Sequence, residues 1–353
     1  MFRTIPIPTD HKDLIHDVAY DFYGRRIATA SSDHSVKVFD RSPDGGWVQT
    51  SSWKCHTGSV WKLTWAHPEF GQILASCSFD RTVSIWEEFE TGNWTRRTQL
   101  VDSRSNVTDV KFGPKHLGLV LACCATDGLV RIYEAPDVMN TGQWNINNEH
   151  QAFNSAHETK GLKISSKQAS VTQQCSCLAW NTSRYHAPML AVGSTDGPDK
   201  SPKLVIIQES SESQQKKWNK LAWPSSHQFS DPVHDLNFAP NMGRTFHLLA
   251  VASSQYVGVV LFSIKPSGNE TSLLHSNFSI DQPTNYIIEK IATLTDHNCI
   301  VWRVSWNVTG TVLASSGENG VVLLWKQNYL KNWKNVYKIK PDDSSGPCVE
   351  LSG

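Results

Sequence analysis

The residues of this chain best suited to acid–base or metal chemistry are histidines and aspartates that recur along the sequence. The recurring positions are His11, His56, His297, Asp33, Asp80 and Asp127. Paired imidazoles and carboxylates can relay protons or bind a metal ion. A catalytic site is formed once, however, whereas repeated positions indicate a repeated structural role. The chain also lacks the HExxH, GxSxG and phosphate-loop patterns. We therefore predict no enzyme activity, no catalytic residues, no cofactor, no metal site and no small-molecule substrate.

The 8 cysteines do not suggest metal or disulfide chemistry either, because none belongs to a CxxC pair. The neighbours Cys123 and Cys124 are predicted to point to opposite faces of a strand. Free cysteine behaves as a small hydrophobic residue. We therefore expect buried, reduced thiols.

Charge and hydropathy exclude several classes of protein. Lys and Arg number 33, Asp and Glu number 33, and the formal net charge is +0, which provides no global field for nucleic acid or an anionic membrane. No stretch approaches the roughly 18 apolar residues of a membrane span, and the N-terminus lacks a signal-peptide pattern. We expect a cytosolic or nuclear protein without direct nucleic-acid binding or membrane insertion.

Six short segments alternate apolar and polar residues and end in an aromatic residue, which indicates half-buried strands. The segments are residues 15–20, 60–65, 107–112, 175–180, 233–238 and 301–306. Their alignment gives an apolar column, Val18, Leu63, Val110, Leu178, Leu236 and Val304, and an aromatic column, Tyr20, Trp65, Phe112, Trp180, Phe238 and Trp306.

After each segment come a strand of small residues, a polar turn, a third strand with a large apolar residue, and a fourth strand that begins at an aromatic residue. Six such units predict an all-β, WD-type, six-bladed β-propeller over residues 1–340. The predicted blades are about 10–54, 55–101, 102–150, 170–224, 228–295 and 296–340, followed by a disordered tail, 341–353.

The second unit carries the fullest WD signature, from His56 through Asp80 to Trp86. In the WD-repeat family, which these units resemble, the His, a Ser or Thr, the Asp and the Trp form a hydrogen-bonded network within the blade. A buried acid is tolerable only when its acceptor positions are filled. We therefore assign structural roles to these residues and to their counterparts, Asp33, Asp127, His297 and Trp325.

The ring is predicted to be open, because each unit contains its own four strands and none is left over to join the two ends. Open end blades expose apolar faces. Phe2, Ile5 and Ile7 either contact a blade inserted by a partner or are disordered, since Pro6 and Pro8 weaken a strand there. Three polar insertions, 148–174, 194–217 and 263–285, are expected to be mobile surface loops.

Four stretches, 10–40, 60–88, 107–140 and 301–333, resemble the Seh-one and Sec-thirteen family of WD-repeat nucleoporins. The match includes loop residues, 67–71 and 134–137, that the fold alone does not require. The resemblance implies an open propeller completed by β-strand addition of a seventh blade from an α-helical scaffold nucleoporin.

The same resemblance implies a scaffold function in the Y-shaped outer ring of the nuclear pore complex at the nuclear envelope, in pore assembly and in protein and mRNA transport. It also implies membership of the GATOR complex, which regulates TOR signalling in response to amino acids. There the protein would be cytoplasmic and at the lysosomal surface, with a Mio-type subunit as the donor of the blade.

An alternative function is a peptide- or phosphopeptide-reading adaptor of another complex, which would require several arginines facing the channel. Arg104 and Arg303 are the candidates, whereas Arg81 and Arg131 are expected on solvent-facing strand positions. Two tryptophans at equivalent positions, Trp61 and Trp302, are expected to pack between blades rather than to form an exposed binding surface.

Overall fold

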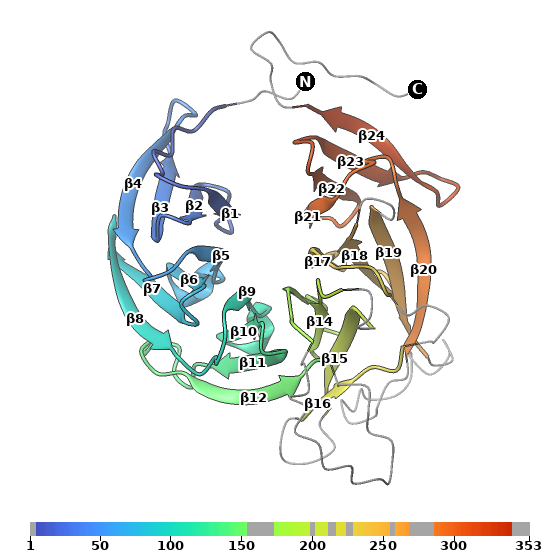
Figure 1. Cartoon of the computed structure of the whole chain (residues 1–353), viewed down its shortest axis with the longest axis horizontal. Helices are drawn as coiled ribbons and strands as arrows, with labels where there is room; N and C mark the ends of the chain where they lie inside the picture. The colour runs from blue at the N-terminus through green and yellow to red at the C-terminus, as the bar shows by residue number, and fades with distance from the viewer. Residues whose placement is uncertain are drawn as a thin grey trace.

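The computed structural model describes residues 5–153, 173–197, 202–210, 217–223, 229–254, 258–267 and 286–340. Within these residues the chain forms six antiparallel sheets of four strands each, arranged as the blades of a ring (Figure 1). In every sheet the strands pair in sequence order, and the first strand of each blade lies nearest the central axis. The predicted six-bladed propeller is therefore confirmed.

The blades are formed by the following strands. The first contains β1 (Ile15–Tyr20), β2 (Arg26–Ser31), β3 (Ser35–Arg41) and β4 (Trp47–Lys54); the second contains β5 (Val60–Trp65), β6 (Ile73–Ser78), β7 (Val83–Glu90) and β8 (Asn93–Leu100); the third contains β9 (Val107–Phe112), β10 (Val120–Ala125), β11 (Leu129–Glu134) and β12 (Asn145–Gln151). The fourth contains β13 (Cys177–Trp180), β14 (Met189–Gly193), β15 (Leu204–Ser210) and β16 (Lys217–Lys220); the fifth contains β17 (Asp235–Phe238), β18 (His247–Ala252), β19 (Val259–Pro266) and β20 (Tyr286–Leu294); the sixth contains β21 (Val301–Trp306), β22 (Val312–Gly317), β23 (Val322–Gln327) and β24 (Trp333–Ile339). Two short 3-10 helices, η1 (Pro68–Phe70) and η2 (Lys115–Leu117), follow β5 and β9.

Small side chains allow the second strand of a blade to pack on both faces. Every residue of β6, β10 and β18 is buried, because a neighbouring blade covers each side close to the axis. Aspartates set the turn that follows this strand. Asp33 accepts the N–H of Ser35 at 3.0 Å, and Asp80 accepts the N–H of Thr82 at 3.1 Å, as expected for aspartate in tight turns.

The hydrophobic core lies between blades rather than within them. One cluster joins Ala28 and Val38 of the first blade to Leu63 and Trp86 of the second. Each blade thus presents a large third-strand residue to the blade before it and small residues to the blade after it. The same packing rule predicts which blade faces are apolar and must be covered by another blade.

The three polar insertions were predicted too wide. Residues 148–151 belong to β12, residues 204–210 form β15, and residues 263–266 belong to β19. β12 is an outer strand, whose polar side chains can remain in solvent, whereas β15 and β19 are third strands whose apolar residues are buried. The remaining parts of these insertions and the tail, 341–353, lie largely outside the described residues. No helix among the described ranges has the length and apolarity to cross a membrane.

Candidate functional site: a slot between the first and sixth blades

The described residues leave one position of the ring without a blade, and the inner strand beside it is exposed. The gap lies between β1–β4 and β21–β24 (Figure 1). Val18 of β1 is 53% exposed, whereas its counterparts in the other blades are at most 3% exposed. Those counterparts are Leu63, Val110, Leu178, Leu236 and Val304. Tyr20 and Ile15 on the same strand are also exposed. The inner strand of the first blade therefore presents apolar surface that the other blades bury.

The sixth blade is uncovered on the side that faces this gap. In β22 and β23 buried residues alternate with half-buried ones. Leu313 and Trp325 are buried against the fifth blade, while Val312, Ala314 and Leu324 on the opposite face are only half-buried. We call the two unpartnered faces the slot: Ile15, Val18 and Tyr20 on one side, and Val312, Ala314 and Leu324 on the other.

The first blade is open to the slot only along its inner strand. Phe39 takes the third-strand position that faces the preceding blade, yet it is buried. The Lys37 ammonium donates to the carbonyls of Thr9 at 2.8 Å and Asp10 at 3.0 Å. These bonds place the segment before His11 beside β3. The chain's own N-terminal segment thus covers part of a face that a blade would otherwise cover.

The same two hydrogen bonds join each odd-numbered blade to the even-numbered blade that follows it. In the first pair the carboxylate of Asp17 accepts the N–H of Leu63 at 2.9 Å, and the indole of Trp65 donates to the Ala19 carbonyl at 3.1 Å. The same two bonds join the third blade to the fourth and the fifth to the sixth. The aspartates are Asp109 and Asp235, and the tryptophans are Trp180 and Trp306.

Sequence reasoning missed this arrangement, although its signal was present. In the aromatic column, tryptophan occurs in even blades only, and an aspartate precedes the apolar column in odd blades only. We name the two bonds the blade staple. They occur at three interfaces, first to second, third to fourth, and fifth to sixth.

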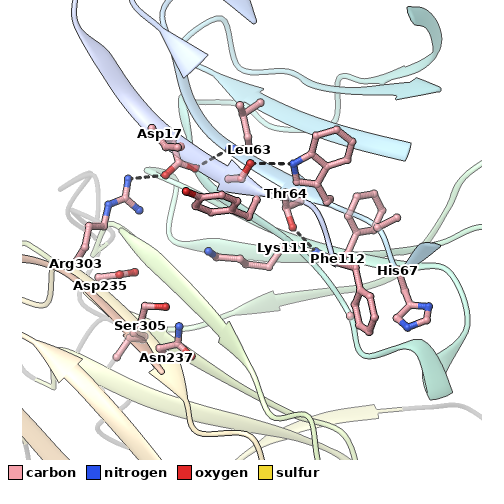
Figure 2. Close-up of a pocket in the computed structure, with 18 of the residues that line it drawn as sticks. Asp17, Leu63, Thr64, His67, Lys111, Phe112, Asp235, Asn237, Arg303 and Ser305 are labelled. Atoms are coloured by element: carbon pink, nitrogen blue, oxygen red, sulfur yellow. Dashed lines mark hydrogen bonds and ion pairs between the residues drawn. The ribbon is translucent and has the colours of Figure 1, made fainter. Parts of the chain in front are cut away.

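The side chain of Arg303 reaches across the slot at its inner end. The guanidinium Nη2 of Arg303, on β21, lies 3.0 Å from Asp17 Oδ1 and donates to the His16 carbonyl at 3.0 Å. Figure 2 shows this guanidinium directed at Asp17. Because the other carboxylate oxygen of Asp17 binds Leu63, this one residue connects the first, second and sixth blades.

The slot opens inward onto a cavity of ≈ 730 Å³, lined by residues of β1, β5, β9, β17 and β21 (Figure 2). Its walls carry Asp17, Lys111, Asp235 and Arg303. Burial lowers the pKa of the Lys111 ammonium, but Asp109 and Asp235 outweigh it and raise that pKa. The cations and the carboxylates near the axis therefore stabilise one another.

This balance does not suit a phosphate ligand, which requires unpaired positive charge. Arg303 is engaged by Asp17. Arg131 was predicted to face solvent, and this was wrong: it is 1% exposed and paired with Asp127 at 2.8 Å and Glu149 at 2.9 Å. The carboxylates on its own blade make burial of the guanidinium tolerable. Arg104 and Arg81 are exposed, Arg81 as predicted, and neither lines the cavity.

The structure brings the WD-signature residues of the second blade together. His56 Nδ1 lies 3.0 Å from Asp80, and His56 Nε2 lies 2.8 Å from the Ser76 hydroxyl, to which Trp86 donates at 3.0 Å. Burial raises the pKa of Asp80, but hydrogen bonds from His56 and Thr82 outweigh it and hold that pKa well below its ordinary value. All these groups are engaged within the blade.

Other blades vary this network. In the sixth, His297 and Trp325 both contact Ser315 at 2.7 Å. Asn319 stands where the second blade has Asp80, and His297 Nδ1 has no partner among the described residues. In the first blade Asp33 lies 2.9 Å from His11. In the third, Arg131 rather than a histidine binds Asp127.

The remaining predicted contact residues lie near the slot or outside the described residues. Phe2 is outside them, Ile5 is exposed and Ile7 is half-buried. Trp61 stacks on His16 at 5.4 Å, and Trp302 packs on His234 at 4.7 Å, so both contact the preceding blade. Both tryptophans nevertheless remain exposed.

No group of three or more potential metal ligands occurs within the part of the chain that the structure describes. Cys123 and Cys124 are buried in different hydrophobic clusters, as their opposite orientation on β10 predicts. Burial raises the pKa of the Cys123 thiol to about 12. These thiols therefore stay protonated and pack as apolar groups.

Comparison with known proteins gives two findings. The model of the WD domain, G-beta repeat, matches residues 3–40, 47–87 and 288–326. Nucleoporin SEH1-A of Xenopus laevis is 51% identical over 353 residues, which cover 97% of this chain and 89% of the relative. Nucleoporin SEH1 of Homo sapiens is 51% identical over 98% of this chain and 90% of the relative, and that of Danio rerio is 48% identical over 100% and 93%.

Proposed function

Because this chain belongs to the nucleoporin SEH1 family, we propose that it is a non-enzymatic scaffold subunit of the outer ring of the nuclear pore complex. In this proposal it binds a partner that inserts a seventh blade into the slot. The observation that carries the proposal is the exposure of Val18, at 53%, in a column that is otherwise at most 3% exposed.

The contacts expected of such a blade follow from the rule at the other interfaces. Its face toward the sixth blade carries large side chains, which pack on the half-buried aliphatic residues Val312, Ala314 and Leu324. Its face toward the first blade covers Val18 and Tyr20. Burial of apolar surface supplies most of the affinity, and the main-chain pairing within the donated sheet fixes its register.

The proposed donor at the pore is an α-helical scaffold nucleoporin. We further propose that the chain serves the GATOR complex in TOR signalling, with a Mio-type subunit as donor, in the cytoplasm and at the lysosomal surface. Both assignments rest on the family resemblance. Since both donors are proposed to fill the same slot, they are expected to exclude each other.

The experiment that tests the function is co-purification of the full chain with the helical scaffold nucleoporin, followed by size-exclusion chromatography and thermal unfolding. We expect one stoichiometric complex with a raised midpoint, because a ligand that binds the folded state stabilises it. A chain whose elution and midpoint ignore this partner would refute the pore assignment. Displacement of one donor by the other then tests the shared slot.

A further inference from the structure

We propose that Arg303 and Asp17 form a clasp that holds the empty slot at the separation a donated blade requires. The inference rests in part on the proposed function, because only a blade donor gives that separation a use. The clasp itself is a property of the free chain.

The first argument is mechanical. In a repeat structure each unit contacts only its neighbours. Without a contact across the slot, the first and sixth blades are joined only through the five intervening interfaces, and small rotations at each of them add up at the two ends. Among the described residues, the contacts of Arg303 are the hydrogen bonds and ion pair that join these blades.

The second argument is geometric. The guanidinium has two acceptors on β1, the Asp17 carboxylate and the His16 carbonyl, each at 3.0 Å. Asp17 is itself fixed, since Leu63 donates to its second oxygen at 2.9 Å and its side chain is only 12% exposed. A fixed, partly buried acceptor pair loses little entropy when the arginine binds, unlike a typical surface ion pair.

The third argument concerns the bonds that the clasp replaces. At the stapled interfaces an aspartate of one inner strand accepts a main-chain N–H of the next. Across the slot, no main-chain N–H of the described residues binds the Asp17 carboxylate. The long side chain of Arg303 reaches the carboxylate of Asp17 in its place, and so joins the ends of an incomplete ring.

The expected consequence is preorganisation. A slot already held at the bound separation loses less conformational freedom when it is filled, which raises affinity without a new contact to the partner. A partly exposed ion pair of this kind corresponds to roughly a twofold to fivefold change in the dissociation constant. Asp17 and Arg303 are therefore positioning residues rather than recognition residues.

The test measures the separation of the two end blades in the free chain by pulsed electron paramagnetic resonance. Spin labels are placed at Val48 on β4 and Lys334 on β24, both exposed. Cys299→Ser and Cys348→Ser remove background labelling. A control pair, Val48 and Thr95, reports a closed interface. We expect Arg303→Met to broaden and lengthen the first distance distribution and to leave the control unchanged.

A conservative series keeps the test independent of misfolding. Arg303→Lys should give an intermediate distribution, and Asp17→Asn keeps an acceptor for Leu63 while removing the charge. Superimposable distributions for wild type and both neutral variants would overturn the clasp. When the scaffold nucleoporin is bound, all distributions should coincide. If wild type binds no donor yet Arg303→Met still broadens the distribution, the proposed function fails and the clasp stands.

Discussion

Replacing Val18 by aspartate should abolish binding of a donated blade while leaving the free propeller folded. Val18 is 53% exposed, and substitutions at exposed positions usually change stability by about 0.5 kcal/mol or less. In the complex the same site would be buried. The complex loses roughly 1 kcal/mol of valine burial and must desolvate a carboxylate, which costs several kcal/mol. A total of about 4 kcal/mol weakens the dissociation constant roughly a thousandfold.

Two matched variants isolate the effect of the slot. Val101→Asp makes the same change at a residue that is 67% exposed on a loop after β8, and it should leave both binding and stability unchanged. Leu63→Asp makes the corresponding change in the same column at a residue that is 3% exposed, and it should unfold the chain or cost at least about 3 kcal/mol.

Binding is measured by isothermal titration with the scaffold nucleoporin, and stability by urea unfolding of each free variant. Two results would refute the reasoning. Wild-type affinity for Val18→Asp would show that the slot is not where the partner binds. Loss of stability comparable to that of Leu63→Asp would show that the face is already covered in the free chain.

Three further predictions concern buried polar groups. Trp86→Phe removes the 3.0 Å bond to Ser76 and should lower the free energy of unfolding by about 1–3 kcal/mol in urea titrations; an unchanged midpoint would contradict the network. Trp306→Phe removes one bond of a blade staple, donated to Asn237 at 3.1 Å, and should cost about 1 kcal/mol in the same assay, an effect that Trp306→Leu must equal or exceed. Burial lowers the pKa of His247 to about 3, so the unfolded chain takes up a proton as pH falls below about 6.5 and the folded chain does not. Stability should therefore fall from pH 6.5 to 5, and His247→Phe should make that fall shallower by up to about 1.4 kcal/mol per pH unit; identical pH profiles for the two proteins would exclude the assignment.

The sequence was sufficient for the propeller because its signal is local and repeated. Each inner strand has a period of two, and five of the six turns carry an aspartate or an asparagine, so six weak patterns reinforce one another. Arg131 shows where this reasoning stops. A charged residue within an apolar strand was expected in solvent, but Asp127 on the same blade and Glu149 on β12 bind it in the interior. Strand periodicity carries no information about such pairing between strands.

The sequence predicts an open ring only because no strand is left over after six units of four strands. Which surface this leaves uncovered depends on packing. Phe39 and Val18 both face the missing blade, yet only Val18 is exposed. The segment before His11 is held beside β3 by Lys37, which donates to the carbonyls of Thr9 and Asp10. No periodic pattern in the sequence predicts these contacts.

The blade staple explains how a ring with one blade missing can remain ordered. Closed propellers restrain every blade from both sides, whereas here the first and sixth blades each lack one neighbour. Both belong to stapled pairs: Asp17 and Trp65 fix the first blade to the second, and Asp235 and Trp306 fix the sixth to the fifth. Each blade beside the slot is thus held by two directional bonds as well as by apolar packing. With an even number of blades, pairwise staples include both end blades. Five blades joined in the same way would leave one end blade without a staple. A missing blade is therefore compatible with end blades that are each held firmly by a neighbour, and the clasp between Arg303 and Asp17 limits the movement that accumulates over the five interfaces between them.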